Sequence, residues 1–167
     1  MIGRKGGGRP MVPVYIRWAI IPDLPALTAM ERGAWGGRGW GEEAFRHALR
    51  ARNCIGMVAE CEGVVIGYVV YELYERALRL LRIGVDADWR RLGVGSQMVA
   101  KLQGKLTGKR CWLVADVPDD LLPVHLFFAS CGLRAKPLDR STYRFAWRVP
   151  AGELVGATDQ PQRGGER

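Results

Sequence analysis

The sequence of 167 residues has no apolar run that approaches the roughly 20 residues needed to cross a bilayer. Arg4, Lys5 and Arg9 stand among glycines near its start, but the apolar segment of a secretory signal does not follow them. These absences predict a cytoplasmic protein with no membrane partner. The chain also lacks internal repeats, and its length suits one domain around one core.

Metal-binding and redox motifs are missing as well. The chain has four cysteines and two histidines, and it contains no C-x-x-C pair. Zinc sites bring several such ligands together at short spacings, and disulfide frameworks belong mainly to small secreted chains. We therefore expect no metal, and we expect reduced thiols in the core for Cys54, Cys61, Cys111 and Cys131.

Positive charge is present in excess, because the formal net charge is +8. Such a chain can bind nucleic acid, a ribosome or an anionic cofactor. No basic stripe interleaved with aromatic residues is evident in the sequence, so direct nucleic-acid binding is not expected. The charge favours the phosphates of a cofactor, and acidic partners in general.

Two terminal segments differ in composition from the middle of the chain. Residues 1–12 are rich in glycine and carry three basic residues and no acidic ones. Residues 150–167 show no apolar periodicity. We expect both segments to be disordered tails, which leaves residues 13–149 as the folded domain.

The most informative segment is a strand that runs through a glycine turn into a helix. An apolar strand from Leu78 to Val85 precedes a polar turn with two arginines and two glycines. A helix face then follows at four-residue spacing, formed by Val94, Met98, Leu102 and Leu106. Glycines let the backbone approach an anion, and the N–H groups and dipole of a helix start attract it. This junction predicts a phosphate-binding site.

The spacing of the turn excludes two common phosphate motifs. A P-loop ends in Gly-Lys-Ser/Thr where this turn has Gly-Ser-Gln, and a dinucleotide loop needs a third glycine where Met98 stands. What remains is Arg-x-x-Gly-x-Gly, formed by Arg90, Gly93 and Gly95. That spacing resembles the pyrophosphate loop of the GCN5-related N-acetyltransferase (GNAT) superfamily, which binds acetyl-CoA. The alternative is a turn that needs glycines for its geometry alone.

Further blocks resemble one branch of that superfamily, the bacterial ribosomal-protein-alanine N-acetyltransferases. The resemblance covers about residues 14–149 and rests on the order and spacing of its blocks. These are Asp23-Leu24-Pro25-Ala26, Met30-Glu31, Trp40-x-Glu42-x-x-Phe45, Ile83-x-Val85-Asp86-x-Asp88 and the run from Leu126 to Leu133. The resemblance implies a GNAT-like α/β fold, in which helices flank a mixed, centrally antiparallel sheet.

Periodicity and turn residues place the elements of such a fold. Asp23 is expected to cap the first helix, and the glycines over 33–41 predict a mobile loop. Strands are expected over 14–20, 56–61, 64–71, 78–85, 111–117 and 143–147, and helices over 23–31, around Phe45, from Val94 and over 120–130. Glu62-Gly63 is expected to join the second and third strands as a hairpin.

The resemblance implies direct transfer of an acetyl group from acetyl-CoA to an amine. The backbone N–H of Val85 would stabilise the negative charge that develops on the carbonyl oxygen. The same strand end would pair with the pantetheine arm, and the turn would hold the pyrophosphate. The residues expected to contact the cofactor are Ile83, Gly84, Val85, Arg90, Arg91, Leu92, Gly93, Val94, Gly95, Ser96 and Phe128.

Two carboxylates are candidates for the general base. The branch usually has a glutamate where Asp116 stands with a shorter side chain, and Glu72 is the second candidate. Either group could instead be a strand-end carboxylate in a salt bridge. An α-amino group has a pKa near 7.7–8.0 and lysine one near 10.4, so a protein N-terminus needs only a modest base.

Two positions depart from the family pattern. Phe128 stands where the family has the tyrosine that protonates the departing thiolate, and Leu121 replaces an asparagine that contacts the cofactor. Both could be core residues at helical spacing. His125, Tyr143 and Tyr68 are the other candidates for a proton donor.

Three functions stay open at this point. The first is acetylation of a protein N-terminal α-amine. The second is acetylation of a lysine or of a small-molecule amine. The third is a non-catalytic acetyl-CoA-binding protein, which the loss of the tyrosine and the asparagine favours. The sequence indicates no oligomeric state.

Overall fold

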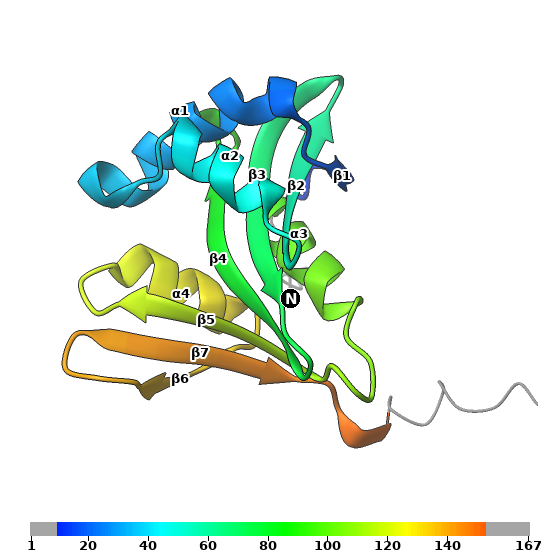
Figure 1. Ribbon diagram of the computed structural model, residues 1–167, viewed down its shortest axis with the longest axis vertical. Coiled ribbons are helices and arrows are strands. Elements are labelled where there is room, and N and C mark those ends of the chain that lie inside the picture. Colours follow the sequence, from blue (N-terminus) through cyan, green and yellow to red (C-terminus); the bar gives the residue numbers. More distant parts are fainter. Residues whose placement is uncertain (1–9, 153–167) are drawn as a thin grey trace, which may run out of the picture.

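The computed structural model describes residues 10–152, so most of the two expected tails lies outside the described residues. Seven strands form one sheet in the order β1-β2-β3-β4-β5-β7-β6 (Figure 1). Neighbouring strands are antiparallel except β4 and β5, which are parallel. The strands are β1 (Tyr15–Trp18), β2 (Cys54–Cys61), β3 (Val64–Leu73), β4 (Ala77–Val85), β5 (Trp112–Pro118), β6 (Arg134–Pro137) and β7 (Thr142–Arg148). The prediction of a mixed, centrally antiparallel sheet is confirmed.

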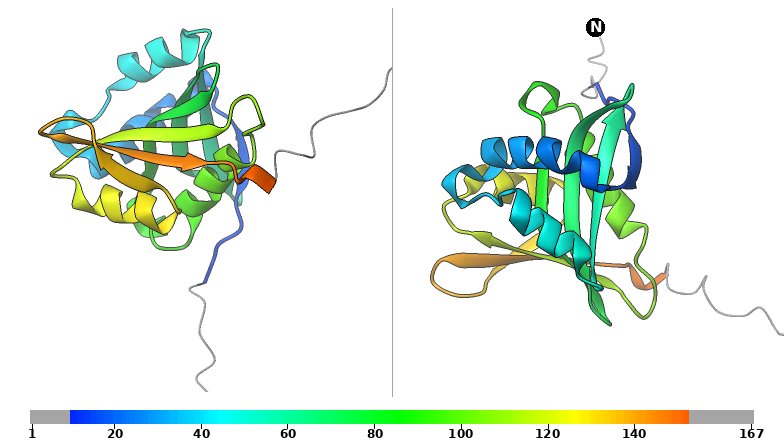
Figure 2. Two further views of the ribbon diagram at one scale, coloured as in Figure 1. Left: turned by 90° about the horizontal axis from the view of Figure 1, so that it is seen from below. Right: turned by 45° about the horizontal axis from the view of Figure 1, so that its top comes forward.

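Helices cover both faces of this sheet. The pair α1 (Leu24–Trp35) and α2 (Glu42–Arg50) lies on one face, and α3 (Val94–Gln103) and α4 (Leu122–Ser130) lie on the other (Figure 2). Short 3-10 segments are η1 (Ile21–Asp23), η2 (Gly36–Arg38) and η3 (Ala87–Trp89). The sheet is therefore the middle layer of three, as the GNAT-like prediction requires.

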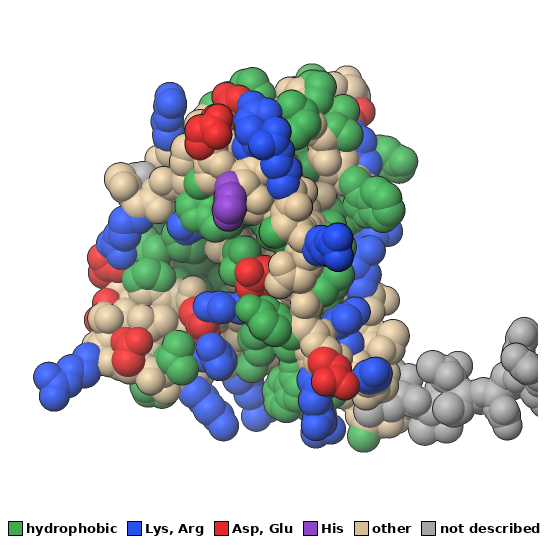
Figure 3. Space-filling model, viewed as in Figure 1, with side chains coloured by type: hydrophobic (Ala, Val, Ile, Leu, Met, Phe, Trp, Pro, Cys, Tyr) green, Lys and Arg blue, Asp and Glu red, His purple; other side chains and the backbone are tan. Residues whose placement is uncertain are grey.

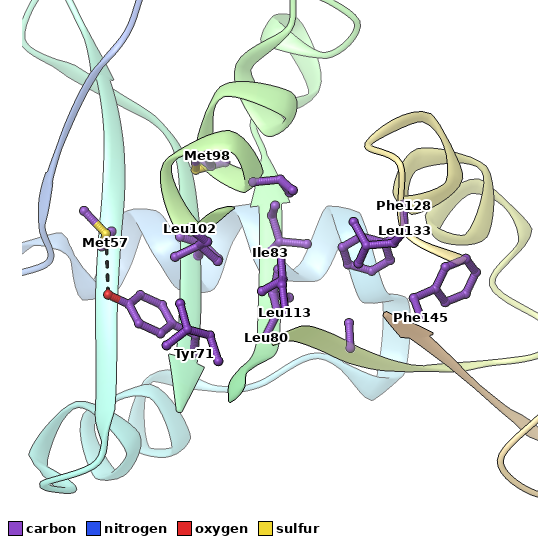
Figure 4. Close-up of a cluster of buried hydrophobic side chains, with 14 of the residues drawn as sticks. Met57, Tyr71, Leu80, Ile83, Met98, Leu102, Leu113, Phe128, Leu133 and Phe145 are labelled. Carbon is purple, nitrogen blue, oxygen red and sulfur yellow. Dashed lines mark hydrogen bonds between the residues drawn. The ribbon is translucent and has the colours of Figure 1, made fainter. Parts of the chain in front are cut away.

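A separate core forms beneath each helix pair. The larger core joins α3 and α4 to the sheet and contains Leu102, Leu113 and Phe128 (Figure 4). The smaller core joins α1 and α2 to the opposite face, where Phe45 packs edge-on against Tyr68 at 5.5 Å between ring centroids. Burial on both faces explains why β3 reads as a nearly continuous apolar run.

The hairpin between β2 and β3 follows the sequence closely. Glu62 and Gly63 both have positive φ values, 49° and 79°. Two consecutive positive φ values are the geometry of a type I′ turn, whose twist matches that of the flanking strands. The predicted hairpin at Glu62-Gly63 is confirmed.

The expected mobile loop over 33–41 is wrong. Helix α1 continues through Gly33 to Trp35, and η2 follows it directly. Trp35 is buried, and its indole N–H donates to a strand carbonyl, so tertiary packing outweighs the helix cost of Gly33. The helix expected over 120–130 starts two residues later, because α4 begins at Leu122 and Asp120 pairs with Arg38. Strand β6 was not predicted.

Asp23 anchors the start of α1 in a way that differs from the expected side-chain cap. Its carboxylate accepts the backbone N–H of Ile20 at 2.8 Å and two N–H groups of Arg17 at 2.8 and 3.0 Å. Arg17 also donates to Glu60 of β2 at 2.8 Å. The Arg17 guanidinium lowers the pKa of the Asp23 carboxyl, which is buried. This network fixes β1 and α1 against the sheet.

We expect Asp23→Asn to lower the free energy of unfolding by about 1–3 kcal/mol at pH 7, because buried hydrogen bonds to a charged group are lost. The folded pKa lies below the unfolded value, so the carboxylate stabilises the fold above about pH 4 and less as the pH falls through the folded pKa. Urea unfolding from pH 7 to pH 2 measures this difference. Glu75→Gln at an exposed position is the control, and a difference that stays constant down to pH 2 would contradict the assignment.

Candidate active site

The sheet opens in the middle, between its two parallel strands. β4 and β5 pair only from Ala77 to Leu80 on one strand and from Trp112 to Ala115 on the other. Beyond these residues β4 pairs only with β3, and β5 pairs only with β7. The two strands diverge in Figure 1, and the opening is called the V below. One edge of each strand therefore faces the V with backbone groups that the sheet does not use.

A β-bulge lies where the V begins. Val70 of β3 is opposite Arg82, and Tyr71 is opposite Leu80, so Leu81 is an extra residue in β4. A bulge of this kind changes the direction of the strand and re-aims the side chains that follow it. It lets Arg82 and the end of β4 face elements other than β5.

The backbone of β4 presents donors to the V at two residues. The Ile83 carbonyl accepts the indole N–H of Trp35 at 3.1 Å, and the Val85 carbonyl accepts Arg90 Nε at 3.2 Å. Asp86 N instead donates to Ile66 of β3 at 2.9 Å. In an antiparallel ladder the N–H and C=O of one residue point to the same edge. The N–H groups of Ile83 and Val85 therefore point into the V.

The predicted phosphate turn has the backbone of an anion site. Arg91 and Gly93 have positive φ values of 62° and 76°, and Gly93 is the N-cap of α3 without a side-chain cap. Residues in left-handed conformation turn successive N–H groups toward one concave point, and the free N–H groups of a helix start add to them. The arginines of the turn add positive charge beside these donors.

These groups line one cleft of about 900 Å³, a volume that suits a cofactor. All the predicted cofactor contacts line it except Leu92 and Phe128: Ile83, Gly84, Val85, Arg90, Arg91, Gly93, Val94, Gly95 and Ser96. Leu92 uses its carbonyl to accept Val12 N at 2.9 Å. The glycine turn and the free edge of β4 thus form one continuous surface that fits the phosphates and pantetheine arm of a coenzyme.

Two walls of the cleft come from segments that the sequence predicted to be a disordered tail and a mobile loop. Pro10 and Met11 lie against the turn, and Gln97 Nε2 donates to Val12 O at 2.6 Å. These residues belong to the expected tail, but they contact the domain. Gly33 and Ala34 at the end of α1 form the other wall. No sequence pattern indicated either contact, because both depend on the tertiary arrangement.

Phe128 does not line the cleft. Its side chain is 1% exposed and packs between Phe127 and Phe145 in the larger core, whereas Phe127 faces the cleft. Leu121 is packed against the same core. Phe128 stands at the position where the resemblance implies a tyrosine, so this position offers no hydroxyl group to the cleft. That Phe128 contacts the cofactor stays a prediction.

A second pocket of about 360 Å³ lies where the V begins. Its lining residues are Trp35, Arg38, Trp40, Arg79, Leu80, Leu81, Arg82, Asp116, Pro118 and Thr142. Figure 3 views this side, where apolar side chains lie in a recess between the two helices above and β5 and β7 below. Trp35 connects the two spaces, because it lines this pocket and bonds to Ile83 in the wall of the cleft.

Asp116 lies in this second pocket, but its carboxylate already accepts hydrogen bonds from arginines. Arg144 donates to both oxygens at 2.7 and 2.8 Å, and Arg79 donates at 3.2 Å. These hydrogen bonds, Arg144 first, hold the pKa of Asp116 below its usual range. Glu72 lines neither pocket and accepts Tyr74 Oη at 3.0 Å. The structure therefore brings Asp116, and not Glu72, to the point where the V begins.

The other candidate proton donors have different contacts. His125 has its Nε2 2.7 Å from the Pro118 carbonyl, and its ring packs edge-on against Tyr143 and Phe145. Tyr68 Oη donates to Glu31 in the smaller core. None of His125, Tyr143 and Tyr68 lines either pocket.

Glu31 is a buried carboxylate whose role sequence reasoning missed. It is 0% exposed and accepts Tyr68 Oη and the Trp40 N–H, the latter at 3.0 Å. Arg82 Nε lies 3.3 Å from its carboxylate. Burial raises the pKa of Glu31. The Met30-Glu31 pair signalled family resemblance only, but in the structure Glu31 fixes the segment after α1 above the second pocket.

A parted pair of parallel strands lies beside a glycine turn at a helix start, which is the arrangement that the resemblance to the GNAT superfamily implies. The family model described as the acetyltransferase (GNAT) family matches residues 24–133, and the chain belongs to this family. Membership makes the protein an N-acetyltransferase that uses acetyl-CoA. A comparison with curated protein sequences finds no match.

Solved structures share the fold. The ribosomal-protein-alanine N-acetyltransferase from Brucella melitensis is 22% identical with a TM-score of 0.63, and covers 81% of this chain and 99% of its own. Ard1 from Thermoplasma volcanium is 19% identical with a TM-score of 0.71, with 83% and 99% covered. The PaiA N-acetyltransferase from Thermoplasma acidophilum, solved with coenzyme A, is 16% identical with a TM-score of 0.65, with 83% and 100% covered. Over residues 10–152, no helix is both long and apolar enough to cross a membrane.

We expect Gly93→Asp to abolish the rise in melting temperature that acetyl-CoA gives the wild type, because the new side chain would press on Met11 in the cleft wall and bring a negative charge to the predicted phosphate turn. Gly63→Asp is the matched control, since Gly63 has a similar φ of 79° in open space outside the cleft. It carries the same backbone strain and should keep the shift. An unchanged shift in Gly93→Asp would remove this turn from the cofactor site.

Proposed function

We propose that this protein acetylates the α-amino group of protein N-termini. The observation that supports this is that the two spaces are lined by adjacent residues of β4: Arg82 lines the second pocket, Ile83 lines the coenzyme cleft, and Trp35 of the second pocket bonds to Ile83. When bound, acetyl-CoA supplies a thioester whose carbonyl carbon accepts the amine. An acceptor that enters the second pocket along β4 and β5 reaches the thioester at this point.

The Ile83 N–H is the donor that we assign to the developing oxyanion. Of the two N–H groups that face the V, it is nearer to the second pocket, since Arg82 is the last residue of β4 that lines that pocket. The N–H of Val85, which the sequence suggested for this role, lies nearer the turn and is placed to pair with the pantetheine arm. A fixed donor of this kind removes roughly 3–4 kcal/mol from the barrier.

The second pocket favours an amine that deprotonates easily. Three arginines line it, and cations near an ammonium group favour its neutral form. Asp116 is a weak base because its pKa is lowered and both of its oxygens are occupied. An α-amine with a pKa near 8 therefore suits this pocket better than lysine near 10.4. Asp116 then acts by positioning Arg79 and Arg144.

A peptide with a free α-amine should react faster than the same peptide N-blocked and bearing one lysine. The gap of about 2.5 pKa units corresponds to about 3.4 kcal/mol in the cost of deprotonation. CoA release measured for both peptides gives kcat/KM. Equal or faster turnover of the lysine peptide would favour a lysine or small-molecule acetyltransferase. A thermal shift with acetyl-CoA but no turnover of any amine would favour a non-catalytic binder.

Asp116→Asn should leave the shape of the pH profile of kcat/KM unchanged, with a rate that rises up to the pKa of the acceptor amine. The reason is that deprotonation of the amine, and not of Asp116, limits the reactive fraction. Rates from pH 5.5 to pH 9 measure this. A loss of about 10²-fold or more across the whole range would instead identify Asp116 as the general base.

A further inference from the structure

Arg82 occupies an unusual position in the second pocket. It is the first residue after the bulge in β4, and its guanidinium lies close to two indoles. The guanidinium carbon is 4.7 Å from the ring centroid of Trp35 and 4.9 Å from that of Trp40. The side chain is only 17% exposed and still lines the pocket. Two indoles within cation–π distance restrict where this guanidinium can lie, and its planar set of N–H groups suits a carboxylate.

The charge of Arg82 is incompletely paired among the described residues. Its Nε lies 3.3 Å from Glu31, but it makes no hydrogen bond there and is buried without a partner. Glu31 already accepts Tyr68 Oη and Trp40 N–H. Arg82 Nη2 has a carbonyl partner, Arg38 O at 3.4 Å, which is neutral and distant. A half-buried cation with weak partners gains strongly from an anion that completes its hydrogen bonds.

The other charges of the pocket do not supply that anion. Asp116 is the acidic residue that lines it, and Arg144 and Arg79 occupy both of its oxygens. Arg38 pairs with Asp120 at the exposed rim. The lining therefore carries three arginines against one aspartate. With the partners outside the lining included, four arginines (Arg38, Arg79, Arg82 and Arg144) lie beside three carboxylates (Asp116, Asp120 and Glu31), and this excess of one cation favours carboxylates over cationic acceptors.

We propose that Arg82 binds a carboxylate of the acceptor, so that this enzyme acetylates α-amines that lie next to an acidic group. The inference rests on the proposed function and names its substrate class: peptides with Asp or Glu at the N-terminus. Arg82 directly precedes Ile83, and Trp35 contacts both residues. A carboxylate bound to the Arg82 guanidinium thus lies beside the place where the amine meets the thioester. In an N-terminal Asp or Glu, only a few bonds separate the side-chain carboxylate from the α-amine.

The test compares peptides that begin with Asp, Asn or Lys and are otherwise identical. Asp and Asn have nearly the same shape, so their ratio of kcat/KM isolates the charge. We expect the wild type to favour Asp over Asn by about tenfold or more, as a charge-assisted hydrogen bond implies, and to use the Lys peptide least. Free aspartate as acceptor distinguishes an amino acid substrate from a peptide, since it offers the same carboxylate without the chain.

Arg82→Gln should reduce the Asp/Asn ratio to within about twofold. Arg148→Gln is the matched control, because Arg148 is also a strand arginine stacked on a tryptophan, at 5.5 Å, but lies outside both pockets. It should keep the full ratio. Arg82→Lys keeps the charge without the planar fork and should retain only part of the preference. An Asp/Asn ratio near one in the wild type, or an unchanged ratio in Arg82→Gln, would overturn the proposal.

A binding measurement separates this proposal from the proposed function. Calorimetry with CoA present compares the Asp and Asn peptides on the wild type and on Arg82→Gln. Tighter binding of the Asp peptide that depends on Arg82 supports the carboxylate site even if no peptide is turned over, and in that case the proposed function alone fails. Turnover of all three peptides with equal binding keeps the proposed function and overturns the carboxylate site. If Arg82→Gln does not fold, Arg82→Lys gives the test, because it keeps the charge without the planar set of donors: a reduced Asp/Asn ratio supports the site and an unchanged ratio contradicts it.

Discussion

The point at which β4 and β5 stop pairing determines how this molecule can work. Backbone N–H and C=O groups need partners, and a sheet that opens must find them elsewhere. On the β4 side, Trp35 satisfies the Ile83 carbonyl and Arg90 satisfies the Val85 carbonyl. The N–H groups of the same two residues face the V. The carbonyls of this strand edge have partners and its N–H groups face open space. Such a row of fixed donors can bind an extended ligand and can stabilise a developing negative charge.

The carboxylates around the V are all committed to partners in the protein. Asp116 accepts hydrogen bonds from two arginines, and Asp120 forms an ion pair with Arg38. Glu31 accepts hydrogen bonds from Tyr68 and from the Trp40 backbone. Each commitment fixes a wall of the second pocket, and each also removes a carboxylate from proton transfer. The arginines keep more donors than these carboxylates can accept, since a guanidinium carries five N–H groups. Electrostatic bias in this site therefore comes from cations.

Local sequence signals predicted what local physics controls. The hairpin at Glu62-Gly63 and the turn around Gly93 depend on positive φ values, which the residue types reveal directly. The path of α1 through Gly33 could not be predicted, because it depends on the bond from Trp35 to a strand 48 residues away in sequence. The bulge at Leu81 is likewise set by long-range register. The core position of Phe128 and the salt bridge of Asp116 were alternatives that the sequence left open, and long-range packing decides them.

The weak base and the missing acid are consistent with each other. A site without a strong base can use only amines that are partly neutral near pH 7, and α-amines meet this condition. A site without a positioned acid needs a leaving group that departs as an anion, and a thiol with a pKa near 8.5 does so with modest help. Placing Phe128 in the core instead of the cleft adds apolar packing and leaves no buried hydroxyl to satisfy. Under the proposed function, this protein contributes binding geometry and arginine charge to the reaction more than proton transfer by side chains.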